Sequence, residues 1–286
     1  SVTPEVQASL QRVLELARTA DVLFVGVGQM GDDAPSTLVG GALAFDRFAL
    51  FATFTICVSV ALVSLVVNDY LTREGEDGPE VYGLILAAAI GGVVMVSAND
   101  LLVLFLGLET LSLSFYLLTA SSRSRTQSGE AGLKYFILGG FSSAFFLYGV
   151  ALIFGSTGST KISGIGETLS GNISIINTDA MLLIGIGLLL VGLGFKVSAA
   201  PFHVWTPDVY EGAPTPVTAF MASAGKVAAF AALLRILMVG LEQRADDWRP
   251  VVVVLAILTL VVGSVLAVVQ TDVKRMLAYS SISHAG

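Results

Sequence analysis

The sequence predicts an all-α fold, a polytopic bundle of transmembrane helices. Of its 286 residues, 55% are hydrophobic and 13% are charged, whereas a soluble domain carries roughly 25% charged residues. Mean hydropathy is +0.83, and several apolar runs approach or reach the ~20 residues that cross a bilayer. A soluble fold of this composition would have too little polar surface.

Charge, cysteine and histidine content exclude several classes of function. The net charge of −7 argues against nucleic acid as a partner, because phosphate binding needs clustered lysines and arginines. Cys57 is the only cysteine, which excludes a disulfide within the chain and a cysteine-ligated iron–sulfur cluster. His203 and His284 lie far apart in the sequence, without the spacing of a metal motif, so no metal site is expected.

The first 40 residues differ from the rest, because they begin polar and resemble a soluble helix followed by a short strand. They contain GVGQMG, which fits the GxGxxG dinucleotide fingerprint, but these glycines lead into Asp32, Asp33 and Pro35 instead of a helix. No signal peptide with a basic start is present in these residues. We predict a soluble-like segment over residues 1–40, with no assigned function.

The apolar runs predict seven spans and the beginning of an eighth, joined by polar loops such as 121–132 and 156–179. Their expected bounds are 48–70, 81–98, 101–120, 134–155, 180–200, 216–240 and 251–269, followed by the incomplete run 270–286. If the loops alternate sides, one side carries five basic residues near the spans and the other carries four. The richer side is predicted to be cytoplasmic; its residues are Arg73, Arg123, Arg125, Lys274 and Arg275, against Arg47, Lys161, Arg244 and Arg249.

The segment from Leu193 to Lys226 contains a predicted helix break between two intramembrane lysines. Pro201 has no amide hydrogen, and its ring would clash with the carbonyl four residues back, that of Val197. An unpaired carbonyl at membrane depth is tolerated only where protein or water satisfies it, so a discontinuous helix lining a polar cavity is expected. A simple kink in a structural helix is the alternative.

Three ionisable residues are the first candidates for proton transfer: Glu109, Lys196 and Lys226. Glu109 lies about 12 Å of helix after Leu101, near mid-membrane. Burial and a nearby carboxylate act oppositely on the proton affinity of a lysine, so Glu109 could switch either amine between holding and releasing a proton. The structural alternatives are a neutral glutamic acid bonded within the bundle and a static ion pair.

Lys134 and His284 are further relay candidates with equally ordinary explanations. Lys134 stands four residues after Glu130 at a helix start, where a surface ion pair is common. His284 follows several serines, and a histidine can pass protons near neutral pH or simply be a hydrogen-bonded bundle residue. His203, after the break, is explained at least as well by capping or interfacial anchoring.

Three stretches closely resemble the antiporter-like membrane subunits of respiratory complex I, most of all subunit N, also called subunit 2. They are KYFILGGFSSAFFLYGVALIFGSTGS, GLGFKVSAAPFHVWTPDVYEGAPTPVTAFMASAGKVAAF and DVKRMLAYSSISHAG. A fourth, ANDLLVLFLGLETLSLSFYLL, resembles the span that bears the family's glutamate. The resemblance covers about residue 41 to the end. It implies a fold of inverted five-helix repeats with broken helices: a first helix and loop over 41–80, a first repeat over 81–240 and an incomplete second repeat over 241–286.

The resemblance also implies roles for individual residues. The glutamate matching Glu109 pairs with the broken-helix lysine matching Lys196, and the lysine matching Lys226 carries the proton. Matches to Lys134 and His284 lie on a polar axis that continues across the subunit. Because the matching lysine of the second repeat would fall beyond Gly286 and the family's first helices have no match, the chain is expected to be a fragment.

The leading hypothesis is a proton-translocating subunit of NADH:quinone oxidoreductase in the inner membrane of a bacterium, an organellar membrane being less favoured. No cofactor is expected in this chain; NADH, FMN, iron–sulfur clusters and quinone would lie in partner subunits. The expected partners are other membrane subunits of complex I, lipid and protons. The alternatives are a subunit of a multisubunit cation/proton antiporter or membrane-bound hydrogenase, and a non-functional fragment or scaffold.

Overall fold

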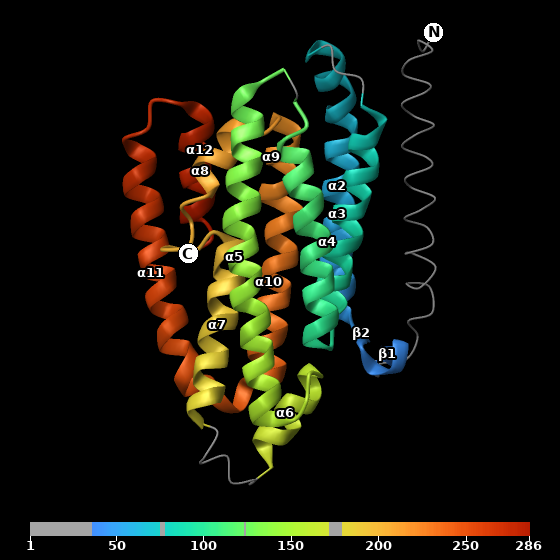
Figure 1. The fold of residues 1–286 in the computed structure, drawn as a ribbon, viewed down its shortest axis with the longest axis vertical. Coiled ribbons are helices and arrows are strands. Elements are labelled where there is room, and N and C mark those ends of the chain that lie inside the picture. Colours follow the sequence, from blue (N-terminus) through green and yellow to red (C-terminus); the bar gives the residue numbers. More distant parts are fainter. Residues whose placement is uncertain (1–35, 75–77, 123, 172–178) are drawn as a thin grey trace.

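Long helices run side by side along the length of the molecule in the computed structural model, which describes residues 36–74, 78–122, 124–171 and 179–286 (Figure 1). Within these ranges seven helices are long and apolar enough to cross a membrane. They confirm the predicted all-α transmembrane class. They are α2 (Arg47–Glu74), α3 (Pro79–Ser97), α4 (Leu101–Thr119), α5 (Thr126–Thr157), α7 (Asp179–Val197), a composite helix over Thr215–Gly240, and Glu242–Val268, which contains α11 (Ala245–Val268).

The composite helix has two π-helical turns. It consists of α9 (Thr215–Phe220), the π-helical η3 (Met221–Gly225), α10 (Lys226–Arg235) and the π-helical η4 (Ile236–Gly240). The 3₁₀ turn η5 (Glu242–Arg244) then leads into α11, and α12 (Val273–Ser283) follows. Lys226 begins α10 directly after a π turn, a feature that is frequent at functional sites.

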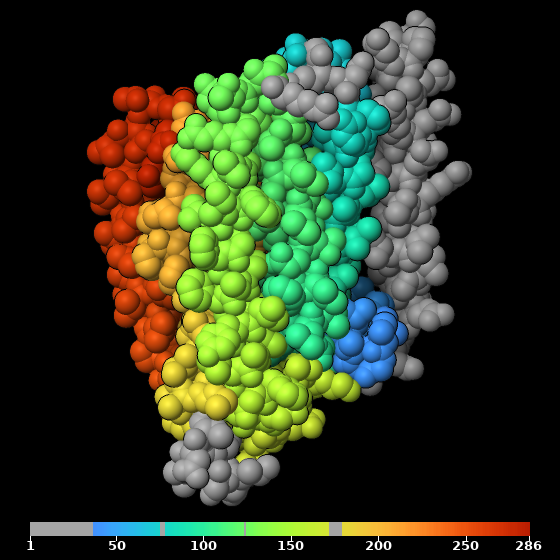
Figure 2. All heavy atoms as spheres, viewed as in Figure 1, coloured from blue at the N-terminus to red at the C-terminus, as the bar shows by residue number. Residues whose placement is uncertain are grey.

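The helices expose large apolar side chains and pack through small ones. On α4 the exposed side chains recur at helical spacing: Leu102, Leu106, Leu113 and Leu117. On its inner face a Cβ added to Gly107 would lie 2.9 Å from the Gly91 carbonyl oxygen of α3. Small residues let transmembrane helices approach closely, and the apolar exterior suits lipid. Figure 2 shows α4 and α5 forming much of one such outer face.

Short elements close one end of the bundle. The antiparallel strands β1 (Ser36–Leu38) and β2 (Leu43–Phe45), joined by η2 (Val39–Gly41), lie beside the start of α4, where the Asn99 amide donates to the Gly41 carbonyl at 3.0 Å. The Asp100 carboxylate accepts a hydrogen bond of 2.6 Å from Thr160, just before α6 (Ile162–Ser170). These contacts hold segments from three parts of the chain together.

A buried ion pair joins the same end to α10. Arg235 is 7% exposed, and its guanidinium donates two bonds to the Asp46 carboxylate, at 2.7 and 3.0 Å, and one to the Val96 carbonyl at 3.2 Å. Burial alone would raise the pKa of Asp46, but the Arg235 bonds and backbone bonds lower it overall. This pair holds the residue directly before α2 against the composite helix.

Several predicted boundaries were wrong. The loop expected over 156–179 contains α6; residues 172–178 lie outside the described residues, as does most of the segment predicted over 1–40. The loop expected over 121–132 is largely helical because α5 begins at Thr126. The span expected to run to residue 200 ends at Val197. Hydropathy does not detect short helices or helix starts made of polar residues, which is why α6 and the first turns of α5 were predicted as loops.

Candidate functional site

The predicted interruption is present, but the helix ends before Pro201 instead of breaking at it. α7 stops at Val197, Ser198 takes a left-handed conformation with φ 64°, and α8 (Thr206–Gly212) begins after a turn. Residues before a proline are disfavoured in helical conformation, so helices commonly end ahead of it.

Protein groups satisfy the interrupted backbone. The Trp205 indole donates to the Phe195 carbonyl at 2.9 Å, and the Ala200 amide donates to the Thr259 hydroxyl of α11 at 2.8 Å. The Thr206 hydroxyl bonds Ser198 Oγ at 2.8 Å. Non-helical backbone at membrane depth is tolerated when buried in protein in this way.

Lys196 lies in the last turn of α7 and is 7% exposed. Its ammonium donates to Ser112 Oγ on α4 at 2.7 Å. It also lies 5.5 Å from the ring centroids of Tyr116 and Tyr135 and 5.7 Å from that of Phe195. Within the described residues Lys196 forms no ion pair, so a hydroxyl and aromatic faces surround the amine.

The aromatic side chains form a rigid wall around this amine. Tyr135 of α5 stacks on Trp205 with ring centroids 4.5 Å apart and planes at 5°, and Trp205 lies 5.2 Å from Phe195. Tyr116 meets Tyr135 edge-on at 4.7 Å. Rings from α4, α5, α7 and the turn after α7 therefore hold the interruption and Lys196 together.

Glu109 is half-buried on α4 and bonds to Ser143 Oγ of α5. It interacts electrostatically with Lys196, but in the described part of the chain the two do not form a direct ion pair. Each binds a serine instead, and Ser112 stands three residues after Glu109 on the same helix. The arrangement is a carboxylate and an amine with hydroxyl groups beside them, which suits proton exchange better than a closed ion pair.

Lys226 follows the π turn η3 and reaches α12. Its ammonium donates to Ser281 Oγ at 2.7 Å and to the Ser281 carbonyl. Gly225 is required beside it, because an added Cβ would lie 2.8 Å from the Phe115 ring. The structure brings Lys226 to Ser281, and no contact joins it directly to Glu109 or Lys196 among the described residues.

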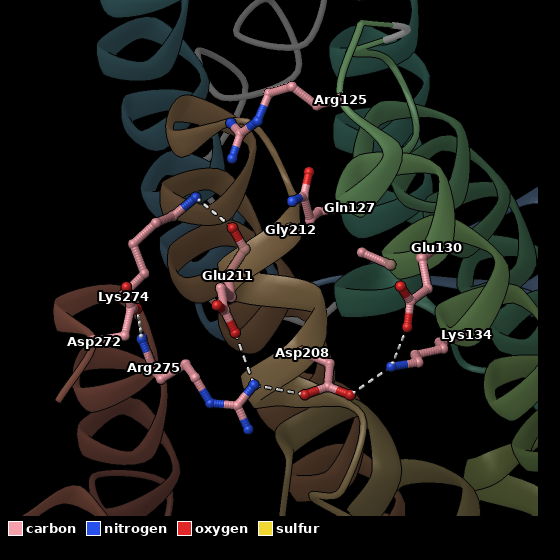
Figure 3. Close-up of a pocket in the computed structure, with 11 residues that line it drawn as sticks. Arg125, Gln127, Glu130, Lys134, Asp208, Glu211, Gly212, Asp272, Lys274 and Arg275 are labelled. Atoms are coloured by element: carbon pink, nitrogen blue, oxygen red, sulfur yellow. Dashed lines mark hydrogen bonds and ion pairs between the residues drawn. The ribbon is translucent and has the colours of Figure 1, made fainter. Parts of the chain in front are cut away.

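Lys134 lies at one end of the bundle, in a charged cavity of about 390 Å³ between α5, α8 and α12 (Figure 3). It bonds Glu130 at 2.8 Å, the surface pair expected from spacing, and Asp208 of α8 at 2.9 Å. Arg275 of α12 binds Asp208 and Glu211, each at 2.7 Å. The bond from Lys134 lowers the pKa of Asp208, burial opposes this, and Arg275 adds to the lowering.

The two histidines have different surroundings. His203 lies in the turn before α8, where burial lowers the pKa of its imidazole and Nδ1 has no hydrogen-bond partner among the described residues. His284 is exposed at the end of α12. Within the described residues, no three histidine, cysteine, aspartate or glutamate side chains could hold a metal ion together. No hydrogen bond or ion pair joins either histidine to Glu109, Lys196 or Lys226 in the described part of the chain.

The polar partners of the candidate residues were not predicted from the sequence: Ser112, Ser143, Ser281 and Asp208. Only Ser112 had a usable signal, its position one helical turn after Glu109. Ser143, Ser281 and Asp208 come from other helices, so their contacts depend on the assembled bundle.

The profile of one protein family, NADH:quinone oxidoreductase/Mrp antiporter transmembrane proteins, matches residues 98–286. NADH-quinone oxidoreductase subunit N 1 of Sorangium cellulosum is 49% identical over 282 residues, covering 94% of this chain and 56% of that protein. The chain spans about half the length of the curated relatives it matches.

Solved structures of the same family also match this chain. A chain of respiratory complex I from Thermus thermophilus matches with a TM-score of 0.78 and 38% identity, over 99% of this chain and 58% of that one. A chain of the Mrp complex from Dietzia shares the fold, with a TM-score of 0.79 and 22% identity over 98% of this chain and 52% of that one. The higher identities favour subunit N over the antiporter alternative. The chain belongs to the NADH:quinone oxidoreductase/Mrp antiporter transmembrane family.

Proposed function

We propose that this chain is part of a proton-translocating subunit N of NADH:quinone oxidoreductase and that Glu109, Lys196 and Lys226 carry its protons. The observation that carries the proposal is the surroundings of Lys196: a buried amine at a helix interruption, with a serine hydroxyl and no ion-pair partner among the described residues. Intramembrane ionisable residues of this kind mark ion paths.

The proton would be exchanged between neighbouring groups. Glu109 interacts electrostatically with Lys196 without closing a direct bond, so a change of charge at the carboxylate alters the proton affinity of the amine. Ser143 and Ser112 can each donate and accept a hydrogen bond, which lets them, with water, bridge the two. Lys226 would then take part through its bond to Ser281 on α12.

Redox work would come from elsewhere in the assembly. NADH, FMN, iron–sulfur clusters and quinone would lie in partner subunits, and this chain would contact other membrane subunits. Residues 81–240 would form a first five-helix repeat and residues 241–286 the start of a second. The cavity end, rich in basic residues, would face the cytoplasm of a bacterium. Relay roles for Lys134 and His284 stay predictions.

The test uses the full-length subunit with Lys226→Met, in assembled oxidoreductase reconstituted into vesicles. Protons moved per NADH oxidised should fall, because methionine fills the space of the lysine without a proton to transfer. Lys161→Met is the matched control, since Lys161 lies exposed at the opposite end and bonds the Gly40 carbonyl. Undiminished proton movement in assembled Lys226→Met would refute the proposal. Failure of this chain to co-purify with any assembly would support the alternative of a non-functional fragment or scaffold.

A further inference from the structure

Two cationic groups that line the charged cavity, Arg125 and Lys274, are not neutralised by any ion pair within the described residues. The other charged groups lining it are bonded: Lys134 to Glu130 and Asp208, and Arg275 to Asp208 and Glu211. Asp272 accepts the Arg275 amide at 2.9 Å as the cap of α12. Arg125 and Lys274 form no ion pair with a described residue.

Arg125 and Lys274 approach the same part of the cavity from different helices. Arg125 is the residue before α5 and Lys274 lies in the first turn of α12; Figure 3 shows both side chains, with Gln127, extending into the same region. Their positive charges repel each other, although Glu211 and Asp272 lie near enough to attract Lys274. Two like charges held together with spare donors favour an anion between them.

Unused donors are available for such an anion. The Lys274 ammonium gives two bonds to backbone carbonyls, of Glu211 at 2.9 Å and Ala213 at 2.7 Å, which leaves one of its three hydrogens. The Arg125 guanidinium has five donors in a planar fork that matches phosphate oxygens. The first turns of α5 and α12 add positive backbone potential at the same place.

We propose that Arg125 and Lys274, with Gln127, form a binding site for a phosphate group at this end of the bundle. The group is either the headgroup phosphate of an anionic lipid or free inorganic phosphate. Basic pockets between transmembrane helices at a membrane surface bind lipid headgroups in this manner. The site does not depend on the proposed proton transfer, because none of its three residues belongs to that set.

The test measures saturable binding to purified full-length protein in two arms. One arm titrates inorganic phosphate by calorimetry, and the other titrates phosphatidylglycerol in mixed detergent micelles and counts bound lipid by native mass spectrometry. We expect saturation in at least one arm: phosphate alone identifies a free anion, and lipid alone identifies a headgroup.

Variants separate this site from general charge attraction. Arg125→Gln should weaken binding about tenfold, equivalent to about 1.4 kcal/mol, while Arg125→Lys should retain part of it. The control is Arg73→Gln, which makes the same change of charge on an exposed α2 residue paired with Asp69 and should leave binding unchanged. If Arg125→Gln does not fold, Lys274→Gln replaces it as the variant expected to weaken binding. No saturable binding in either arm, or equal binding by wild type and the cavity variants, would overturn the proposal.

Discussion

Arg235 and Lys196 are equally buried cations, each 7% exposed, with opposite surroundings. Arg235 gives two bonds to Asp46 and one to a backbone carbonyl, and an arginine stays protonated in proteins. Lys196 has one serine hydroxyl and the faces of aromatic rings. A fully paired cation of this kind fixes the helices it joins, whereas the surroundings of Lys196 leave its amine without a closed ion pair, as the proposed proton exchange requires.

Breaking the fixed pair should have the largest effect on stability. Asp46→Asn leaves the Arg235 charge buried without a carboxylate, so we expect a loss of about 3 kcal/mol. Thermal unfolding of the purified full-length protein in detergent measures it. Asp69→Asn, which removes an exposed partner of Arg73, should cost less than about 1 kcal/mol. An equal decrease in unfolding free energy in the two variants would show that the buried Arg235–Asp46 pair stabilises the fold no more than an exposed pair does.

Glu109→Gln should impair function more than folding. The substitution removes the charge that acts on Lys196 but retains an amide able to bond Ser143, so turnover of the assembled oxidoreductase should fall about tenfold or more. Proton movement in vesicles measures it. The matched control is Glu130→Gln, an exposed carboxylate bonded to Lys134, for which we expect little change. Full activity of Glu109→Gln would separate this carboxylate from the proton path.

Removing the hydroxyl beside Lys196 should have an intermediate effect. Ser112→Ala deletes the bond to the ammonium, and turnover should fall by about threefold because a hydrogen bond to a charged group is lost. Ser114→Ala on the same helix removes only a bond to the Thr110 carbonyl and serves as the control. If both variants behave alike, Ser112 has no special part in proton exchange.

The smallest effect concerns pH and the ion pairs of the cavity. Because the pKa of Asp208 is lowered in the folded protein, its stabilising contribution is complete above the unfolded pKa of about 3.9 and is lost as pH falls through the lower folded value. The difference in unfolding temperature between wild type and Asp208→Asn should thus be constant near neutral pH and narrow below about pH 4. If the difference in unfolding temperature instead widened as the pH fell, the pKa of Asp208 would not be lowered by folding.

Hydropathy and spacing predicted the parts of the fold that depend on local sequence. Apolar runs gave the seven spans, and the lysines beside Pro201 indicated an interrupted helix. Nine-residue α6 was missed because a short amphipathic helix has no membrane-length apolar run. The early end of α7 depends on Ser198 and on a hydroxyl of α11, which the sequence does not bring together by itself.

The candidate site was predictable in its charged residues but not in their contacts. Glu109, Lys196 and Lys226 were recognisable because a charge in an apolar run is costly. Serine gives no comparable signal, so Ser143 and Ser281 were not expected as partners. Lys134 illustrates the limit: its pairing with Glu130 follows from spacing on one helix, whereas its bond to Asp208 needs α8 to pack against α5.

The sharpest test of proton exchange at Lys196 is Lys196→Arg, because arginine keeps a positive charge at the site but does not release a proton at ordinary pH. The measurement is the number of protons moved per NADH oxidised by assembled oxidoreductase in vesicles, with the amount of assembled complex determined alongside. We expect the variant to assemble and to move fewer protons than wild type. Proton movement equal to wild type would mean that Lys196 supplies only a fixed charge, as Arg235 does.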